Sequence, residues 1–338
     1  MLTLGIETSC DETSAAVVKD GRFVLSNVVA SSLALHQVHK GIIPEIASRA
    51  HIEYISLVVR QALQKAKKRM LDITAVCVTS GPGLLGSLLV GISFAKAVCF
   101  ALKKPLIAVN HLEAHIYAPF LFTSGAGNPG VVPGIKQERP RLPCIGLVVS
   151  GGHTSLFLVD KSFFFKGIGA TVDDAAGEAF DKVAKILKLG YPGGPVIEKM
   201  AKKGDAGKLK FSCRGPDDLG FSFSGIKTAV LYKTREAEYG MRDADIAASF
   251  QKAVVGVLAD KSFAACHRYK ISTLVVGGGV AANRYLRDYF QQDAKSRNAR
   301  VYFPGPTLSL DNAAMIAGLG YQLYRRGARS DYYLSANI

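Results

Sequence analysis

The 338-residue sequence contains no CxxC pair, no basic leader and no apolar run of membrane-spanning length without a glycine, lysine or polar break. Its six cysteines are scattered and stand mostly in apolar surroundings, which is typical of reduced core thiols rather than disulfides. The chain goes directly into a strand-like run, without the pattern of a secretory or transit peptide. These absences predict a cytoplasmic protein with no membrane segment.

Acidic residues are also scarce. Only 27 aspartates and glutamates stand against 42 lysines and arginines, which gives a net charge of +15. Such an excess indicates a polyanionic partner, and we favour nucleic acid over merely solvated basic faces. No zinc-finger, homeodomain or RNP-type pattern is present, so recognition would rest on phosphates and shape. The basic residues form four groups: Lys65 to Arg69, Lys202 to Lys210, Lys295 to Arg300, and Arg325 to Arg329.

What the sequence does have is an internal duplication. Residues 5–18 and 146–159 align without a gap and share Gly5/Gly146, Ser9/Ser150, Thr13/Thr154, Ser14/Ser155 and Val18/Val159. Each stretch reads as an apolar strand, a turn of small polar residues and a second apolar strand, the pattern of a tight β-hairpin. Two unrelated hairpins with chance identities are the alternative. Small hydroxyl- or glycine-bearing turns of this kind suit phosphate oxygens.

A second pair of segments supports the duplication. The run 75–79 leads through Ser80-Gly81-Pro82-Gly83 into an apolar helical stretch over 84–102. The run 274–276 leads through glycines 277–279 into a helical stretch that reaches Phe290. Both turns would place backbone N–H groups at a helix start, where an anion is favoured. Either turn alone could serve ordinary packing, but two in the same order as the hairpins indicate related halves.

These repeats predict an α/β protein of two duplicated lobes with a cleft between them. A stretch rich in glycine and proline separates the halves. We expect a first lobe over residues 1–125, a linker or loop over 126–143, a second lobe over 144–310, and a final helix over 311–338 that packs back toward the first lobe.

A candidate metal site follows the strand-like run that ends at residue 109. His111 and His115 are one helical turn apart, so a helix would place both on one face, where they could bind one ion. Glu113 does not directly follow the first histidine, as the base of a zinc protease must, and points away from the pair. Histidines that only cap or pack a helix are the alternative. Asp311 is a candidate third ligand, and two imidazoles with one carboxylate suit Fe(II) or Zn(II).

Longer motifs run almost from end to end of the chain. Those of the first half are GIETSCDETS from Gly5, GIIPEIASRAH from Gly41, GPGLLGSLLVG from Gly81 and NHLEAH from Asn110. Those of the second half are VSGGHTSL from Val149, DDAAGEAFDKVAKILKLGYPGGP from Asp173, FSFSGIKTAV from Phe221, GGGVAANRYLR from Gly277 and DNAAMIA from Asp311. With these motifs the chain resembles the universal tRNA N6-adenosine threonylcarbamoyltransferases, formerly called O-sialoglycoprotein endopeptidases, and its bacterial-type catalytic subunits in particular. That family belongs to the actin-like, sugar kinase and Hsp70-type ATPase superfamily.

The resemblance implies transfer of a threonylcarbamoyl group from threonylcarbamoyl-AMP to N6 of the adenosine 3′-adjacent to the anticodon, in tRNAs that read ANN codons. It implies one Fe(II) per subunit, with Zn(II) or another divalent metal as the alternative. It also implies a paralogous actin-like partner subunit and a small ATPase. By family position, the acyl-adenylate or a related ATP-type nucleotide would be held by Val148, Val149, Ser150, Gly151, Gly152, Asp181, Gly194 and Asn283.

Two acidic residues of the first hairpin turn, Asp11 and Glu12, are candidate catalytic groups that would accept or orient a proton. Ordinary turn chemistry is the alternative reading. One departure from the family pattern is Leu310, which stands where relatives usually carry threonine, so a hydroxyl beside Asp311 is missing.

Two other functions fit the same fold. An actin- or Hsp70-like ATPase would use magnesium and need no histidine pair. A non-catalytic partner paralogue would lose the HxxxH motif and much of the second half, and this chain keeps both.

Overall fold

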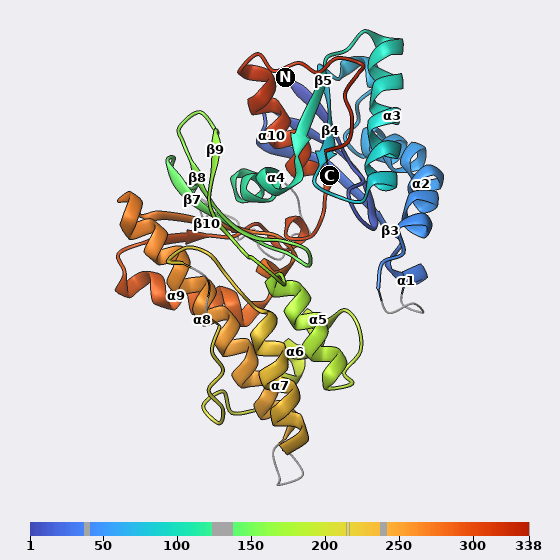
Figure 1. Ribbon diagram of the computed structural model, residues 1–338. Helices are drawn as coiled ribbons and strands as arrows, with labels where there is room; N and C mark the ends of the chain where they lie inside the picture. Colours follow the sequence, from blue (N-terminus) through green and yellow to red (C-terminus); the bar gives the residue numbers. More distant parts are fainter. Residues whose placement is uncertain (37–40, 124–137, 214, 216, 237–241, 338) are drawn as a thin grey trace. The chain divides into compact units, whose positions relative to one another are not determined.

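The computed structural model describes residues 1–36, 41–123, 138–213, 215, 217–236 and 242–337. The chain forms two compact units: Met1–Glu138 with Pro304–Ile338 makes unit 1, and Arg139–Phe303 makes unit 2. The loop expected over residues 126–143 falls mostly outside the described residues. Each unit is built on one β-sheet with helices packed against it (Figure 1).

Unit 1 has a six-stranded sheet of order β5-β4-β1-β2-β3-β6. Its strands are β1 (Leu2–Glu7), β2 (Glu12–Lys19), β3 (Phe23–Ser31), β4 (Ala75–Gly81), β5 (Leu106–Asn110) and β6 (Phe122–Thr123). Strands β1, β4 and β5 run parallel, and β2 returns antiparallel to β1 through the predicted hairpin. Nearly every residue of β1 and β2 is buried, because helices cover both faces of this part of the sheet.

Unit 2 has a five-stranded sheet of order β11-β10-β7-β8-β9, which is the order of unit 1 without its edge strand β6. Its strands are β7 (Cys144–Val149), β8 (Thr154–Val159), β9 (Phe165–Ala170), β10 (Thr273–Gly277) and β11 (Arg300–Tyr302). The register is repeated as well: Gly5 lies opposite Ala16, and its aligned residue Gly146 lies opposite Phe157. The α/β fold and its duplication are confirmed.

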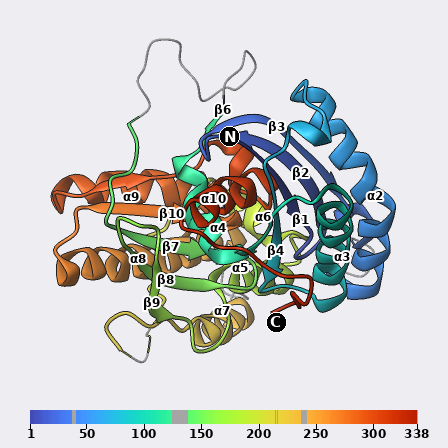
Figure 2. The ribbon, with the colours of Figure 1, turned by 90° about the horizontal axis from the view of Figure 1, so that it is seen from above.

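The helices of unit 1 lie on opposite faces of its sheet (Figure 2). Leu4 and Ile6 join a core with α2 and α3, whereas Thr3 and Gly5, which alternate with them, contact α10. The helical elements of this unit are α1 (Leu33–His36), α2 (Pro44–Lys65), η2 (Met70–Asp72), α3 (Leu85–Leu102), α4 (His111–Tyr117), η3 (Ala118–Phe120), η6 (Pro306–Leu308) and α10 (Ala313–Arg325).

Helix α10 packs on the sheet at short range because glycine leaves room for it. A Cβ atom on Gly5 would overlap the Ala313 carbonyl, and one on Gly320 would overlap the side chain of Cys77. The Thr3 hydroxyl donates to the Ala317 carbonyl at 3.0 Å. These contacts bring the start of α10, and with it the segment just before Ala313, against strand β1.

The second glycine turn differs from the prediction. Glycines 277–279 lead into the 3-10 turn η5 (Gly279–Ala282), and the α-helix begins only at Arg284, because the Asn283 side chain caps it. The helical elements of unit 2 are α5 (Ala176–Ile186), α6 (Gly193–Ala201), α7 (Ser224–Glu236), α8 (Asp243–Tyr269), η5 and α9 (Arg284–Ser296).

Among the described residues, α3 is the one helix that is long and apolar enough to cross a membrane by length and composition, and 33% of its apolar window is buried. It packs against α2 and β4, and its Leu88 and Ile92 are in the core of unit 1. Helices that cover a sheet often have this composition, so the observation is weak evidence for a membrane segment.

The residues after α10 return along unit 1 to the first glycine turn. Ser330 donates its N–H to the Leu106 carbonyl at 2.9 Å, and Asn337 donates its N–H to the Ser80 carbonyl at 2.6 Å. Gly81 has φ +151, and a Cβ atom there would overlap the Asn337 carbonyl. The turn between β4 and α3 therefore needs glycine at this position, because the tail lies against it.

Candidate functional site

Three neighbouring parallel strands of unit 1 end at the same edge of the sheet. Strand β1 ends at Glu7, β4 carries Thr79 close to its end, and β5 ends at Asn110. The Asn110 Oδ1 accepts hydrogen bonds from the N–H groups of Leu112 and Glu113, at 2.9 and 3.1 Å. This cap starts helix α4 at His111, which places the first histidine of the HxxxH motif beside the ends of β1 and β4.

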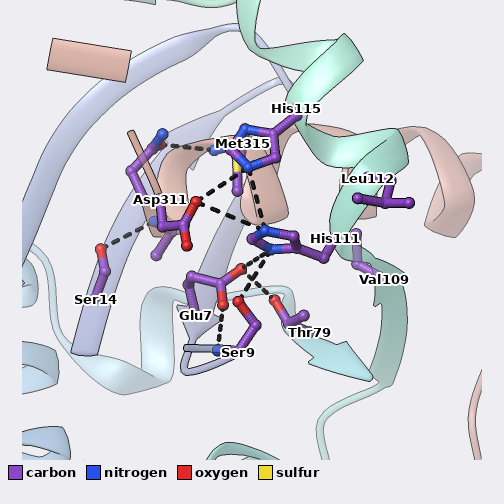
Figure 3. A network of polar contacts seen from close by, with 12 residues as sticks. Glu7, Ser9, Ser14, Thr79, Val109, His111, Leu112, His115, Asp311 and Met315 are labelled. Atoms are coloured by element: carbon purple, nitrogen blue, oxygen red, sulfur yellow. Dashed lines mark hydrogen bonds and ion pairs between the residues drawn. The ribbon is translucent and has the colours of Figure 1, made fainter. Parts of the chain in front are cut away.

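His111, His115 and Asp311 point toward one another (Figure 3), and their ligand-type atoms all lie within 4.8 Å. The two Nε2 atoms are 3.2 Å apart. Asp311 Oδ1 lies 3.0 Å from Nε2 of His115 and 3.6 Å from Nε2 of His111. Both histidines are buried. Two imidazole nitrogens and a carboxylate oxygen directed at one point form the donor set of a divalent transition metal, so these residues fit such an ion.

Glu7 fixes the opposite side of the His111 ring (Figure 3). Its Oε2 lies 3.0 Å from Nδ1 of His111 and accepts a hydrogen bond from the Thr79 hydroxyl at 2.7 Å. Its Oε1 accepts from the Ser9 N–H at 2.6 Å. An ionised carboxylate can only accept, so Nδ1 carries the hydrogen and Nε2 is directed to His115 and Asp311. Glu7 was not singled out from the sequence, although it stands inside the motif GIETSCDETS that begins at Gly5.

Glu7 and His111 shift each other's pKa inside this cluster. Burial acts to raise the pKa of Glu7 and to lower that of His111, but the attraction between the two groups outweighs it. The pKa of Glu7 is therefore held below its ordinary value, and that of His111 is raised to about 9, with Asp311 contributing. Without a metal, His111 is therefore protonated on both ring nitrogens at neutral pH, and a metal ion bound at Nε2 would replace the proton there.

Two neighbours of the cluster have different surroundings. Burial raises the pKa of Glu113 to about 7, and the opposing influence is Arg326. Leu310 has a 58% exposed side chain, and its carbonyl accepts from Asn312 Nδ2 at 2.8 Å. The side chain that replaces the family's threonine is therefore directed to solvent, so no buried hydrogen bond to the metal ligands is lost there.

Asp11 and Glu12 lie at the turn between β1 and β2, in the same unit. Asp11 is buried and Glu12 is half-buried. Burial raises the pKa of Glu12 to about 9, and the carboxylates of Asp11 and Asp311 add to the shift. Glu12 therefore holds a proton at neutral pH. Burial and the same carboxylates raise the pKa of the Cys10 thiol far above its usual range, which argues against a thiolate nucleophile.

The turn between β7 and β8 contains the residues expected to hold the acyl-adenylate. Val148 and Val149 are wholly buried and pair with Ser155 and Thr154 of β8, so in this structure they support the turn and expose no surface to a ligand. Gly151 and Gly152 are exposed, and a Cβ atom on either would have no neighbour within 4 Å. The Ser150 carbonyl accepts from the N–H of Gly177 in α5 at 3.2 Å, which places the start of that helix against the turn.

Asp181, Gly194 and Asn283 are the other three residues expected to bind the nucleotide, and they differ in how far their polar groups are already hydrogen-bonded within the protein. Asp181 accepts from the Gly193 N–H at 2.6 Å, and burial raises its pKa. Gly194, in the first turn of α6, has open space where a Cβ would lie. Asn283 uses both ends of its side chain: Oδ1 accepts from the Leu286 N–H at 3.0 Å, and Nδ2 donates to Gln251 at 2.9 Å.

Solved structures with related architecture share little sequence with this chain. Component A of (R)-2-hydroxyglutaryl-CoA dehydratase from Acidaminococcus fermentans has a TM-score of 0.54 at 14% identity, covering 95% of this chain and 98% of its own. HypF from T. kodakarensis has a TM-score of 0.64 at 15% identity, covering 96% of this chain and 48% of its own. With two sheets in one strand order, these likenesses define a protein of the actin-like ATPase and sugar-kinase fold.

The sequence comparisons are more specific. The profile of the tRNA N6-adenosine threonylcarbamoyltransferase family matches residues 23–318. The relative of that name from Dictyoglomus turgidum is 48% identical over 342 residues, covering 100% of this chain and 98% of its own. The one from Symbiobacterium thermophilum is 49% identical over 340 residues, covering 99% and 95%. The chain belongs to this family, and it is a transferase that modifies adenosine in tRNA.

Proposed function

We propose that this enzyme transfers the threonylcarbamoyl group of threonylcarbamoyl-AMP to N6 of the adenosine 3′-adjacent to the anticodon, in tRNAs that read ANN codons. The observation that carries the proposal is the convergence of His111, His115 and Asp311 in a chain that matches the family along its whole length. The two rival functions lack such support, since neither an ATPase nor a scaffold subunit requires this cluster.

The reaction sets clear demands on the site. The N6 nitrogen forms a bond to the carbamoyl carbon, and the bond from that carbon to the phosphate oxygen breaks. AMP leaves with the electron pair, and one N6 proton passes to a base. Because an adenine amine is a weak nucleophile, both reactants must be held in line. Charge that develops on the carbamoyl and phosphate oxygens must also be stabilised.

We assign Fe(II) to the His111, His115 and Asp311 cluster, with Zn(II) as the alternative that metal analysis distinguishes. A divalent ion held there supplies Lewis-acid stabilisation of negative oxygens. Glu7 supports this role by keeping His111 in the tautomer that presents Nε2. A bound cation would also offset part of the Asp311 charge that acts on Glu12.

Proton transfer falls to the β1–β2 turn in this proposal. Because Glu12 holds a proton at neutral pH, it orients rather than accepts. Asp11, its neighbour in the turn, is the proposed proton acceptor. The pair would then provide one acceptor and one donor from adjacent residues.

We assign nucleotide binding to unit 2. The turn from Ser150 to Gly152 is open at its two glycines and suits phosphate oxygens, and the buried Val148 and Val149 hold it at the end of β7. In this proposal Asp181, which accepts from the Gly193 N–H at the start of α6, also accepts ribose hydroxyls, with Gly194 beside it. Asn283 contributes by holding the start of α9.

Exposed surfaces support the proposed partners. Lys67, Lys68 and Arg69 are exposed, as is the group that begins at Lys202, so tRNA affinity should fall steeply as salt rises. On α2 and α3, Ile52, Leu85 and Leu89 are 65%, 47% and 45% exposed, and we propose that the paralogous actin-like subunit covers them. The small ATPase is the second partner that the family resemblance implies. Six free thiols and a tRNA substrate favour the cytoplasm.

The direct test is mass spectrometry of nucleosides from tRNA incubated with the metal-loaded enzyme and threonylcarbamoyl-AMP, with and without the two partners. We expect N6-threonylcarbamoyladenosine at the position next to the anticodon. A tRNA with guanosine at that position is the matched control and should stay unmodified. ATP hydrolysis without any modified nucleoside would contradict the proposal and favour the ATPase.

A further inference from the structure

The backbone of the β1–β2 turn is held from outside at three consecutive carbonyls. The Ser9 carbonyl accepts from the Leu84 N–H at 2.8 Å. The Cys10 carbonyl accepts from His51 Nε2 at 3.0 Å and from the Ser87 hydroxyl at 3.4 Å. The Asp11 carbonyl accepts from the N–H and the hydroxyl of Ser32, at 3.0 and 2.8 Å. A turn fixed at three consecutive carbonyls has little freedom to shift.

His51 is the contact that spans the acidic pair. It comes from the middle of α2, is wholly buried, and reaches the turn with both ring nitrogens. Nε2 contacts the Cys10 carbonyl, and Nδ1 lies 2.8 Å from the Thr13 hydroxyl. Cys10 directly precedes Asp11, and Thr13 directly follows Glu12, so one imidazole ring connects the residues on either side of the two carboxyl groups.

The chemistry of the partners fixes the protonation of this ring. A carbonyl oxygen can only accept, so Nε2 carries the hydrogen. Burial lowers the pKa of His51, so the ring is neutral, and Nδ1 accepts from the Thr13 hydroxyl. Both ring nitrogens are thus used with defined polarity. No other described contact joins Cys10 to Thr13 in this way.

We propose that His51 is a positioning residue for the transfer reaction: its ring holds Asp11 and Glu12 in the geometry in which they handle the proton of the attacking amine. This inference rests on the proposed function of the turn and adds to it a residue that touches neither metal nor substrate. Misplacement of a catalytic group by about 1 Å can lower a rate about a hundredfold, so loss of the ring should act on turnover.

The test separates the hydrogen bond made by Nε2 of His51 from the one made by Nδ1. His51→Leu removes both hydrogen bonds. His51→Gln keeps a donor where Nε2 stood, and His51→Asn keeps an acceptor where Nδ1 stood. We expect kcat to fall about tenfold or more in His51→Leu and less in the two amide variants, while KM for tRNA and threonylcarbamoyl-AMP and the bound metal stay at wild-type values.

Thr13→Val keeps the experiment informative if His51→Leu does not fold. It should lower kcat in the wild-type background but have no further effect in His51→Gln, which has already lost the Thr13 bond. Thr13→Ser, which keeps the hydroxyl, should restore the rate.

Val58→Ala is the matched control, because Val58 is buried on the same helix and belongs to the apolar core with Leu4 and Ile6. It should lower Tm without changing kcat. If His51→Leu changes Tm and kcat only as Val58→Ala does, the inference is overturned. If Asp11→Asn transfers at the wild-type rate, the proposed function of the turn fails first, and this inference fails with it.

Discussion

The β1–β2 turn of unit 1 and the β7–β8 turn of unit 2 are the two hairpin turns of the internal duplication. They now differ in burial, in charge and in the space around their backbone. The register of their strands is the same. The turn of unit 1 is buried, held at its carbonyls by other elements and followed by two acidic residues. The turn of unit 2 is open, has two glycines without near neighbours, and is closed by its own bonds between Ser150 and His153.

This difference is what the proposed division of roles requires: proton transfer at the turn of unit 1 and nucleotide binding at the turn of unit 2. The strands fix where each turn lies, and substitution within the turn decides whether it presents side chains or backbone. Carboxyl groups need neighbours that set their protonation, so they are placed in a closed turn. An anion needs unobstructed N–H groups, so an open glycine turn suits it. We therefore expect variants of the two turns to fail in different assays.

The largest effect should come from the metal ligands beside the first turn. His111→Ala, His115→Ala and Asp311→Ala should each lower bound metal and reduce transfer about a thousandfold, because several kcal/mol of charge stabilisation is lost. Combined variants should be little worse than single ones. Metal analysis and nucleoside mass spectrometry measure both quantities. Binding of an AMP-containing ligand to unit 2 should be unchanged; full transfer without metal would rule out this assignment.

The acidic pair should respond unequally. Asp11→Asn should lower kcat about a hundredfold, as loss of a proton acceptor does. Glu12→Gln should be mild between pH 6 and 8, because the amide resembles the protonated carboxyl group that a pKa of about 9 maintains. As pH rises through the pKa of Glu12, which burial and Asp11 hold above its usual range, the carboxyl ionises in the wild type, so any loss of rate that accompanies this ionisation should be absent from Glu12→Gln. An equal loss in both variants at neutral pH would contradict this division of roles.

The open turn can be blocked without harm to the fold. Gly151→Val should weaken binding of an AMP-containing ligand about tenfold to a hundredfold, since a side chain there enters the space proposed for the phosphate. Circular dichroism and Tm should stay as in the wild type. Gly167→Val, at an exposed β9 position that also has open space, is the control and should bind normally. Wild-type affinity in Gly151→Val would place the phosphate elsewhere.

The smallest effect should come from Glu113. Its carboxyl group is influenced by Arg326 and is not part of the metal cluster. Glu113→Ala should therefore keep its metal and change kcat less than about twofold. A protease would require such a glutamate, so complete loss of transfer in this variant, with the histidine variants unaffected, would reverse our reading of α4.

Much of the fold could be predicted from the sequence because its signals are local. The hairpins repeat within fourteen-residue stretches, and HxxxH places two ligands by helical spacing alone. Asp311 was a candidate third ligand from its residue type, and no spacing ties it to the histidine pair. The start of α9 was misplaced, because three glycines suggested a helix start and the effective signal was the cap at Asn283.

Glu7 and His51 could not be found in this way. Glu7 matters because strand pairing sets β1 beside β4, so that Thr79 and His111 meet one carboxylate. His51 matters because α2 packs across the same strands and reaches the turn from the side. In both cases the chemistry depends on which distant segments pair, and a buried acid or histidine within an apolar pattern gives no indication of its partner.

Unit 1 is assembled from the two ends of the chain, and this has a consequence for its biosynthesis. Ser14 accepts a hydrogen bond from the Ala313 N–H, 299 positions away, and Asp311 belongs to that late segment. Unit 2 is continuous in sequence, so it can fold on the ribosome while one face of the first sheet still lacks α10. His111 and His115 are synthesised about 200 residues before Asp311, which completes the cluster. The proposed metal site is therefore complete only after the segment that carries Asp311 has been synthesised.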